Sequence, residues 1–221
     1  MLKAIFQRVI VLGICMNISA CSNTISWDEE VKLNDGRMIV VTQKKLMDHG
    51  IDREAWLTFS LPEFSKAEIL WHENLTPMVL NVHDGRLYLI GLPQTRIEFY
   101  KYAMPRPSYV PFRWEGGGWQ RIPFAEVPAA IYDVNMLIDS TPPEGTKILT
   151  WPTKTSAEVN GKAGYPKEIR RLDPQYVNGN DPDASKFELQ RLERAKQERE
   201  RVKQEKLQPS SNDRGADSPD K

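Results

Sequence analysis

The stretch YVPFRWEGGGWQRIPF, residues 109–124, carries the clearest sign of how this chain folds. Two runs rich in aromatic and β-branched residues flank a Glu-Gly-Gly-Gly break, a pattern typical of a β-hairpin. Trp114 and Trp119 stand next to the break, so we expect the two indoles to face each other across the strands. Proline cannot donate to the ladder, and Pro111 and Pro123 therefore indicate that parts of these strands lie near a sheet edge.

Two more hairpins are predicted upstream. Residues 31–43 and residues 78–92 each contain aliphatic, β-branched runs on both sides of an Asp-Gly-Arg turn. Further strands are expected over residues 66–73 and 95–103, and short helices over residues 43–49 and 124–138. The sequence therefore predicts a mainly β domain of antiparallel hairpins, over residues 27–150, arranged as a small sandwich or curved sheet with short helices.

The composition changes after residue 150. Residues 151–183 are rich in Pro, Gly and Asn, which predicts an extended segment. Residues 184–207 are dense in Glu, Lys, Arg and Gln, which favours a charged helix. Their few apolar residues do not form a sustained stripe, so a coiled coil is only weakly indicated. Residues 208–221 are rich in Ser, Asn and Asp, and a disordered tail is expected there.

The N-terminus has the three zones of a secretory signal. Lys3 and Arg8 supply positive charge, residues 9–18 are mostly apolar, and Ser19 and Ala20 are small. The apolar run is far shorter than the roughly eighteen residues that a membrane-spanning helix needs. We therefore predict a signal peptide over residues 1–20.

The segment Ile18-Ser19-Ala20-Cys21 resembles the lipobox of bacterial lipoproteins, with Ile in the place of the usual Leu. The resemblance implies cleavage before Cys21, a diacylglyceryl group on its thiol and a third acyl chain, such as palmitate, on its amine. Residues 21–26 would then be a lipidated linker. Each buried methylene adds about 0.8 kcal/mol, so two or more chains anchor a protein stably. Ser22, in a position where Asp favours retention in the inner membrane, favours the outer membrane. The alternative is an ordinary thiol behind an ordinary or uncleaved signal.

Cysteine content and charge limit what the domain can be. The chain contains two cysteines, Cys15 and Cys21, so residues beyond 21 have no disulfide, no thiolate metal site and no cysteine nucleophile. Removal of Lys3 and Arg8 with the signal leaves 28 basic and 30 acidic residues, a net charge of about −2. That balance gives no electrostatic case for nucleic acid as a partner.

No motif in the sequence predicts a catalytic site, a metal site or a cofactor site. The three histidines, His49, His72 and His83, lack HxH or HExxH spacing. Gly116–Gly118 lacks the lysine and helix of a phosphate-binding loop, and no serine lies in a G-x-S-x-G or S-x-x-K motif. The acids at 28–30 are interpreted as a solvated start to the first strand. Tyr109, Trp114 and Trp119 are the residues that we would assign to a ligand face, although core packing is the more common role of such aromatics.

Three segments resemble an uncharacterised family of proteobacterial proteins. They are WDEEVKLNDGR (residues 27–37), PMVLNV (residues 77–82) and WQRIP (residues 119–123). The resemblance extends over about residues 27–140 and ends before the charged helix. It implies no activity, because no chemistry is assigned to a residue of that family.

The sequence thus favours a lipid-anchored envelope protein on the outer membrane, facing the periplasm, that is not an enzyme. Its β-rich domain would present a recognition or scaffolding surface to an envelope protein partner. Two alternatives are a cell-envelope hydrolase with a motif-free active site, which would gather His72 or His83 with acids and a hydroxyl, and a ligand-binding module lined by aromatic side chains.

Overall fold

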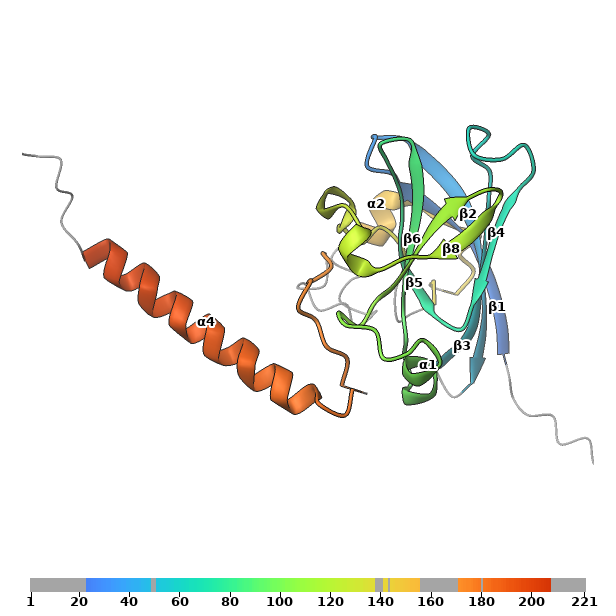
Figure 1. Cartoon of the computed structure of the whole chain (residues 1–221). Helices are drawn as coiled ribbons and strands as arrows, with labels where there is room; N and C mark the ends of the chain where they lie inside the picture. The colour runs from blue at the N-terminus through green and yellow to red at the C-terminus, as the bar shows by residue number, and fades with distance from the viewer. Residues whose placement is uncertain are drawn as a thin grey trace, which may run out of the picture.

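The computed structural model describes residues 23–48, 51–137, 141–142, 144–155, 171–179 and 181–207. In these residues the chain forms two β-sheets packed face to face, with short helices at their margins and one long helix that projects from the body (Figure 1). Strands predominate, so the predicted mainly β fold class is confirmed.

The first sheet, sheet 1, has five strands in the spatial order β4-β3-β2-β1-β9. They are β1 (Asn23–Lys32), β2 (Met38–Asp48), β3 (Ile51–Phe59), β4 (Ile69–Glu73) and β9 (Ile148–Leu149). Strands β1 to β4 form an antiparallel meander, and β9 pairs in parallel with β1. Buried and exposed residues alternate along β1 and β2, so one face of sheet 1 is turned to the core.

The second sheet, sheet 2, has four antiparallel strands in the order β5-β6-β7-β8. They are β5 (Thr76–His83), β6 (Arg86–Leu92), β7 (Val110–Glu115) and β8 (Gly118–Arg121). All three predicted hairpins are present. Asp84 and Gly85 both have positive φ, as a two-residue type I′ turn requires. Trp114 pairs with Trp119 as expected, with ring centroids 5.4 Å apart in an edge-to-face arrangement.

The main core lies between the sheets and draws on both of them. Val31, Leu57 and Trp71 from sheet 1 meet Leu80 and Leu89 from sheet 2, all nearly or fully buried. A second group of buried residues, the outer cluster, covers the other face of sheet 2. Its members are Met78, Val79, Tyr88, Ile90, Tyr109, Ile122, Val127, Ile131 and Leu172. Sheet 2 is therefore covered on both faces, which explains why almost every residue of β5 is buried.

Side chains connect the two sheets at two places. Between β5 and β1, the Asn135 amide accepts a bond from the Leu80 N–H at 2.9 Å. Its Nδ2 donates to the Leu80 C=O at 2.7 Å and to the Lys32 C=O at 2.9 Å. Between β8 and β4, the Trp119 indole N–H donates to the Leu70 C=O at 3.1 Å. A side-chain amide has the donor and acceptor of a peptide group, so Asn135 acts as a one-residue extension of an edge strand.

Two local predictions are wrong, for identifiable reasons. Residues 95–103 were expected to be a strand, but they contain helix α1 (Arg96–Lys101). Thr95 and Glu98 form a capping box there, each side chain bonding the other's backbone N–H, and this pair stabilises the start of the helix. Residues 43–49 were expected to be helical, but β2 continues to Asp48 because it pairs on both sides, with β1 and β3.

The segments outside the hairpins are only partly as predicted. Residues 124–138 contain two 3₁₀ turns, η1 (Phe124–Glu126) and η2 (Ala129–Ile131). Residues 151–183 were expected to be extended; their described part contains helix α2 (Trp151–Thr155), and Leu172 packs into the outer cluster. Residues 23–26, expected to belong to a linker, are the first residues of β1. The predicted signal peptide, Cys21 and the C-terminal tail lie outside the described residues.

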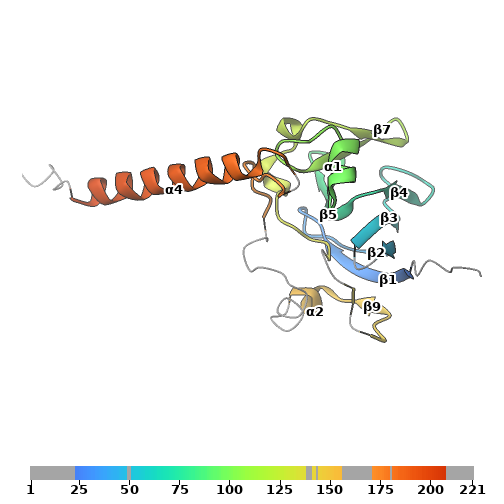
Figure 2. The ribbon, with the colours of Figure 1, turned by 90° about the horizontal axis from the view of Figure 1, so that it is seen from below.

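Helix α4 (Ala184–Leu207) has the bounds predicted for the charged helix. Its 24 residues correspond to a length of about 36 Å. Figures 1 and 2 show it leaving the body of the protein from its N-terminal end. Ion pairs such as Glu198–Arg201 and Glu200–Lys203, three residues apart, support a helix that has no apolar stripe to bury. Within the described part of the chain, no helix combines the length and apolar character needed to cross a membrane.

Candidate functional site

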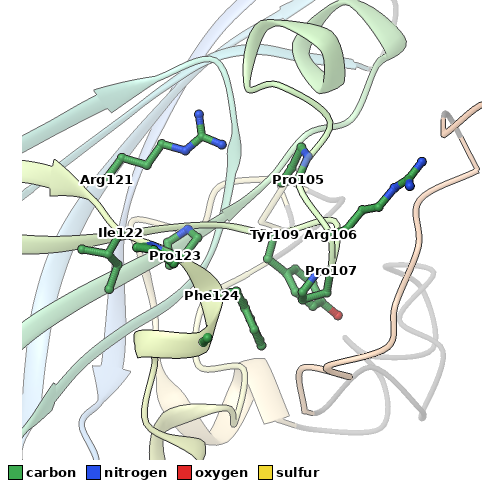
Figure 3. Close-up of a pocket in the computed structure, with 10 residues that line it drawn as sticks. Pro105, Arg106, Pro107, Tyr109, Arg121, Ile122, Pro123 and Phe124 are labelled. Atoms are coloured by element: carbon green, nitrogen blue, oxygen red, sulfur yellow. The ribbon is translucent and has the colours of Figure 1, made fainter.

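A pocket of about 380 Å³ lies beside the outer cluster, where the loop after α1 meets the end of β8 (Figure 3). Its lining consists of Pro105, Arg106, Pro107, Tyr109, Pro111, Arg121, Ile122, Pro123, Phe124 and Ala125. Four of these residues are prolines, whose φ angles are fixed by the ring. The prolines restrict the backbone of the walls, which lowers the conformational entropy that ligand binding would cost there.

The apolar floor of the pocket is a stack of aromatic rings. The Tyr109 ring lies between those of Phe124 and Tyr176, with centroid distances of 5.5 Å and 5.4 Å. The Tyr109 hydroxyl accepts a hydrogen bond from the Asp173 N–H at 3.3 Å. Burial raises the pKa of Tyr109, so its hydroxyl stays protonated at neutral pH. Tyr109 thus supplies a neutral surface rather than a proton acceptor.

Arg121 provides one of the two charges of the pocket. Its Nη2 donates to the Tyr102 C=O at 2.5 Å, and its guanidinium lies over the Tyr102 ring at 5.8 Å. Among the described residues no partner is found for its Nε and Nη1 groups, and the side chain is exposed. The lining contains no carboxylate. Arg121 therefore offers charged donors that have no protein partner among the described residues, at the rim of an apolar pocket.

Arg106 provides the second charge, and it is already paired. Its Nε and Nη2 donate to the two carboxylate oxygens of Asp181 at 2.8 and 2.9 Å, and Nη2 also donates to Asp183 at 3.2 Å. Its guanidinium lies 4.8 Å from the ring centre of Phe187, on the first turns of α4. Burial alone would raise the pKa of Asp181, but hydrogen bonds from Arg106 and the Asp183 N–H hold that pKa below its usual value. Arg106 thus connects the pocket to the start of α4.

The structure separates the three residues assigned to a ligand face. Tyr109 lines the pocket, whereas Trp114 and Trp119 contact each other at the tip of the β7–β8 hairpin and pack against the main core. The Trp114 indole N–H donates to the Phe64 C=O at 3.4 Å, which turns it toward the loop before β4. The two tryptophans hold the hairpin against sheet 1, and only Tyr109 belongs to the pocket.

The described histidines lie apart from the pocket. His72 stacks on Trp56 with centroids 4.5 Å apart, and its Nε2 lies 2.8 Å from a Glu54 carboxylate oxygen. His83 lies at the β5–β6 turn, 3.4 Å from Asp84. His49 is outside the described residues. No group of three or more metal-ligating side chains occurs in the part of the chain that the structure describes.

A buried ion pair, which was not predicted from the sequence, joins α2 to sheet 1. The Lys154 ammonium donates to the Glu29 carboxylate at 2.6 Å and to the C=O groups of Glu30 and Asn135. Burial lowers the pKa of Lys154, while the Glu29 charge acts in the opposite direction. Glu29 is fully buried, so the interpretation of residues 28–30 as a solvated start of a strand is wrong for this residue. All donors of Lys154 are satisfied, which indicates a structural role.

Sequence reasoning also missed Arg106, Arg121 and Phe124. The pocket forms from two segments, residues 105–111 and 121–125, that become neighbours only when β7 and β8 pair. The available signal was the density of prolines in residues 105–123, which is unusual inside a hairpin.

Comparison of the chain with protein-family models, with curated proteins and with solved structures finds no match.

Proposed function

We propose that this chain is a lipid-anchored protein of the bacterial cell envelope, and that its β-domain is a non-enzymatic recognition module that binds an envelope protein partner through the pocket around Tyr109. The anchor part of the proposal rests on the lipobox Ile18-Ser19-Ala20-Cys21. Ser22, after the cysteine, favours the outer membrane, with the domain in the periplasm.

The position of the first strand bears on how such an anchor would act. β1 begins at Asn23, two residues after Cys21. Two residues span at most about 7 Å, so lipid on Cys21 would hold this end of sheet 1 close to the bilayer surface. The module would work at a nearly fixed distance from the membrane.

The recognition part rests on one observation, the composition of the pocket. Its walls are mainly prolines, aromatic rings and aliphatic side chains, and its polar side-chain groups are two guanidiniums and the Tyr109 hydroxyl. A guanidinium cannot act as a base at neutral pH, and the raised pKa of Tyr109 keeps that hydroxyl protonated. Rigid apolar walls with a few charged donors suit binding with low entropic cost.

Photo-crosslinking in cells tests the recognition role. The full chain would carry benzoylphenylalanine at Ala125, an exposed residue of the pocket lining. The matched control carries it at Ala130, an exposed residue of η2 outside the lining. We expect a discrete crosslinked protein adduct from the Ala125 position and none from Ala130. Absence of any adduct at Ala125 above the Ala130 background would reject the recognition role.

A further inference from the structure

We infer that the pocket binds an extended acidic peptide segment, with a carboxylate on Arg121 and an apolar or proline residue over the Tyr109 and Phe124 rings. This inference rests on the proposed function, because it names the chemistry of the partner that the pocket would recognise. Three features of the structure support it, one from charge, one from the β8 edge and one from the start of α4.

The first feature is the charge of the pocket. Of the two guanidiniums in the lining, that of Arg106 is already paired with the carboxylates of Asp181 and Asp183, so the positive charge left for an anion is that of Arg121. Arg106 is occupied by Asp181 and Asp183, whereas the Nε and Nη1 groups of Arg121 have no partner among the described residues. A planar guanidinium with free donors matches a carboxylate in geometry as well as in charge. Arg121 is thus the position at which an acidic side chain would bind.

The second feature is β8, the last strand of sheet 2, which pairs with β7 on one side only. The Ile122 N–H donates to the Pro111 C=O at 3.1 Å, which makes residues 111 and 122 a hydrogen-bonded pair. In an antiparallel ladder such pairs alternate with pairs whose main-chain groups point away. Arg121, opposite Phe112, therefore turns its N–H and C=O away from β7, and no main-chain partner for them is found among the described residues.

Arg121 thus carries its guanidinium at the rim of the pocket, beside Tyr102, and turns its peptide group away from β7. An extended peptide can pair with such an edge as an added strand, whereas a small anion cannot use it. The combination favours a peptide over a free anion or a lipid headgroup.

The third feature is a segment of the chain itself that shows the proposed chemistry. Asp181-Pro182-Asp183 places two carboxylates on Arg106, and Phe187 lies against the same guanidinium. An acid-proline-acid sequence followed by an aromatic ring is therefore compatible with this part of the surface. A partner segment of the same kind would extend the interaction across to Arg121.

Fluorescence polarisation with defined peptides tests the inference. The protein is the full-length chain in mild detergent, and the probe is fluorescein-labelled Asp-Pro-Asp-Ala-Ser-Lys-Phe, the sequence of residues 181–187. One comparison peptide has Asn in place of both Asp residues. Another keeps the acids but carries N-methyl groups on alternate backbone nitrogens, which removes strand-type pairing. We expect the acidic probe to bind, and both comparison peptides to bind about tenfold more weakly.

Variants locate the binding to the pocket. Arg121→Gln should weaken binding of the acidic probe about tenfold, and Arg121→Lys should restore part of it, because charge returns without the planar fork. Arg86→Gln is the matched control, since Arg86 is an exposed arginine on the β5–β6 turn outside the lining. Circular dichroism and the unfolding midpoint of Arg121→Gln should match those of the parent, which separates lost binding from lost folding.

Several outcomes would overturn the inference. It fails if the Asn peptide or the N-methylated peptide binds as tightly as the acidic probe, or if Arg121→Gln leaves binding unchanged. It also fails if Arg121→Gln abolishes binding to phosphatidylglycerol vesicles but not to the probe, because the ligand would then be a lipid surface. If the acidic probe does not bind while Ala125 still crosslinks a protein in cells, the recognition role stands and the assigned ligand class is wrong.

Discussion

The ammonium nitrogen of Lys154 lies 2.6 Å from Oε1 of Glu29, and both side chains are almost completely shielded from solvent. The carboxylate also accepts bonds from Trp27, Gln43 and the Leu137 N–H, so each of its oxygens is used twice. This pair connects α2 to β1 through two residues that are 125 positions apart in the sequence.

Breaking this pair should destabilise the fold strongly. Lys154→Met leaves the Glu29 charge buried without its counter-ion, and we expect a loss of about 3–5 kcal/mol in the free energy of unfolding, measured by urea titration. Lys147→Met, at an exposed lysine nearby, should change it by less than about 0.5 kcal/mol. A Lys154→Met variant as stable as the parent would show that the pair does not connect α2 to the sheet.

Removal of the Asn135 amide should open the gap between β5 and β1. Asn135→Ala leaves the Leu80 N–H and C=O and the Lys32 C=O without their partner, and we expect a loss of about 2–3 kcal/mol. Amide hydrogen exchange at Leu80 should be faster in Asn135→Ala than in the parent, because the acceptor of the Leu80 N–H is gone. Equal exchange at Leu80 in the variant and the parent would contradict the assigned role.

Gly91 in β6 lies so close to the Leu75 side chain that there is no room for a side chain at position 91. A Cβ at this position would lie 2.8 Å from the Leu75 Cβ, a contact that forces the backbone to shift. We expect Gly91→Ala to lower the melting temperature by an amount equivalent to about 2 kcal/mol. Gly118→Ala is the matched control, because nothing lies within 4 Å of the added methyl group there. If the two variants have the same melting temperature, the packing around Gly91 is looser than described.

The raised pKa of Tyr102 should make the free energy of unfolding fall at alkaline pH. Burial first, and then its hydrogen bond to Glu73 at 2.6 Å, raises the pKa of the Tyr102 hydroxyl. In the unfolded chain this hydroxyl ionises near pH 10, so above about pH 10 the folded state holds a proton that the unfolded state has lost. The stabilisation that this raised pKa gives to the fold is complete below about pH 10 and is lost as the pH rises further. Urea midpoints measured between about pH 8 and pH 11 should fall less steeply for Tyr102→Phe, and identical slopes would refute this assignment.

Short-range patterns in the sequence predict those hairpins and helices whose structure depends on residues close together in the chain. The Asp-Gly turns specify the β1–β2 and β5–β6 hairpins, and the composition of residues 184–207 predicts α4 with the observed bounds. Residues 95–103 show the limit of apolar pattern alone, because the Thr95–Glu98 capping box decides in favour of a helix.

The site was less predictable, because it depends on contacts between distant segments. Side chains alternate between the two faces of a strand, so Glu29 lies on the same face as the buried residues Trp27 and Val31. This alternation indicates a side chain that points into the core, whereas the charge of Glu29 suggested exposure. Nothing near Arg106 indicates that its partner is Asp181, 75 residues later. Such pairings follow from the packing of the outer cluster, which short-range patterns do not encode.

Metabolic labelling with an alkyne fatty acid tests the lipid anchor, on which the proposed role depends, most directly. Cells that express the full chain or its Cys21→Ala variant would be labelled, and the purified protein would be joined to a fluorescent azide and examined by gel. We predict a fluorescent band at the position of the mature protein, found in the membrane fraction, and its loss in Cys21→Ala. An unlabelled parent protein, or a label that persists in Cys21→Ala, would contradict the anchor and with it the proposed place of action.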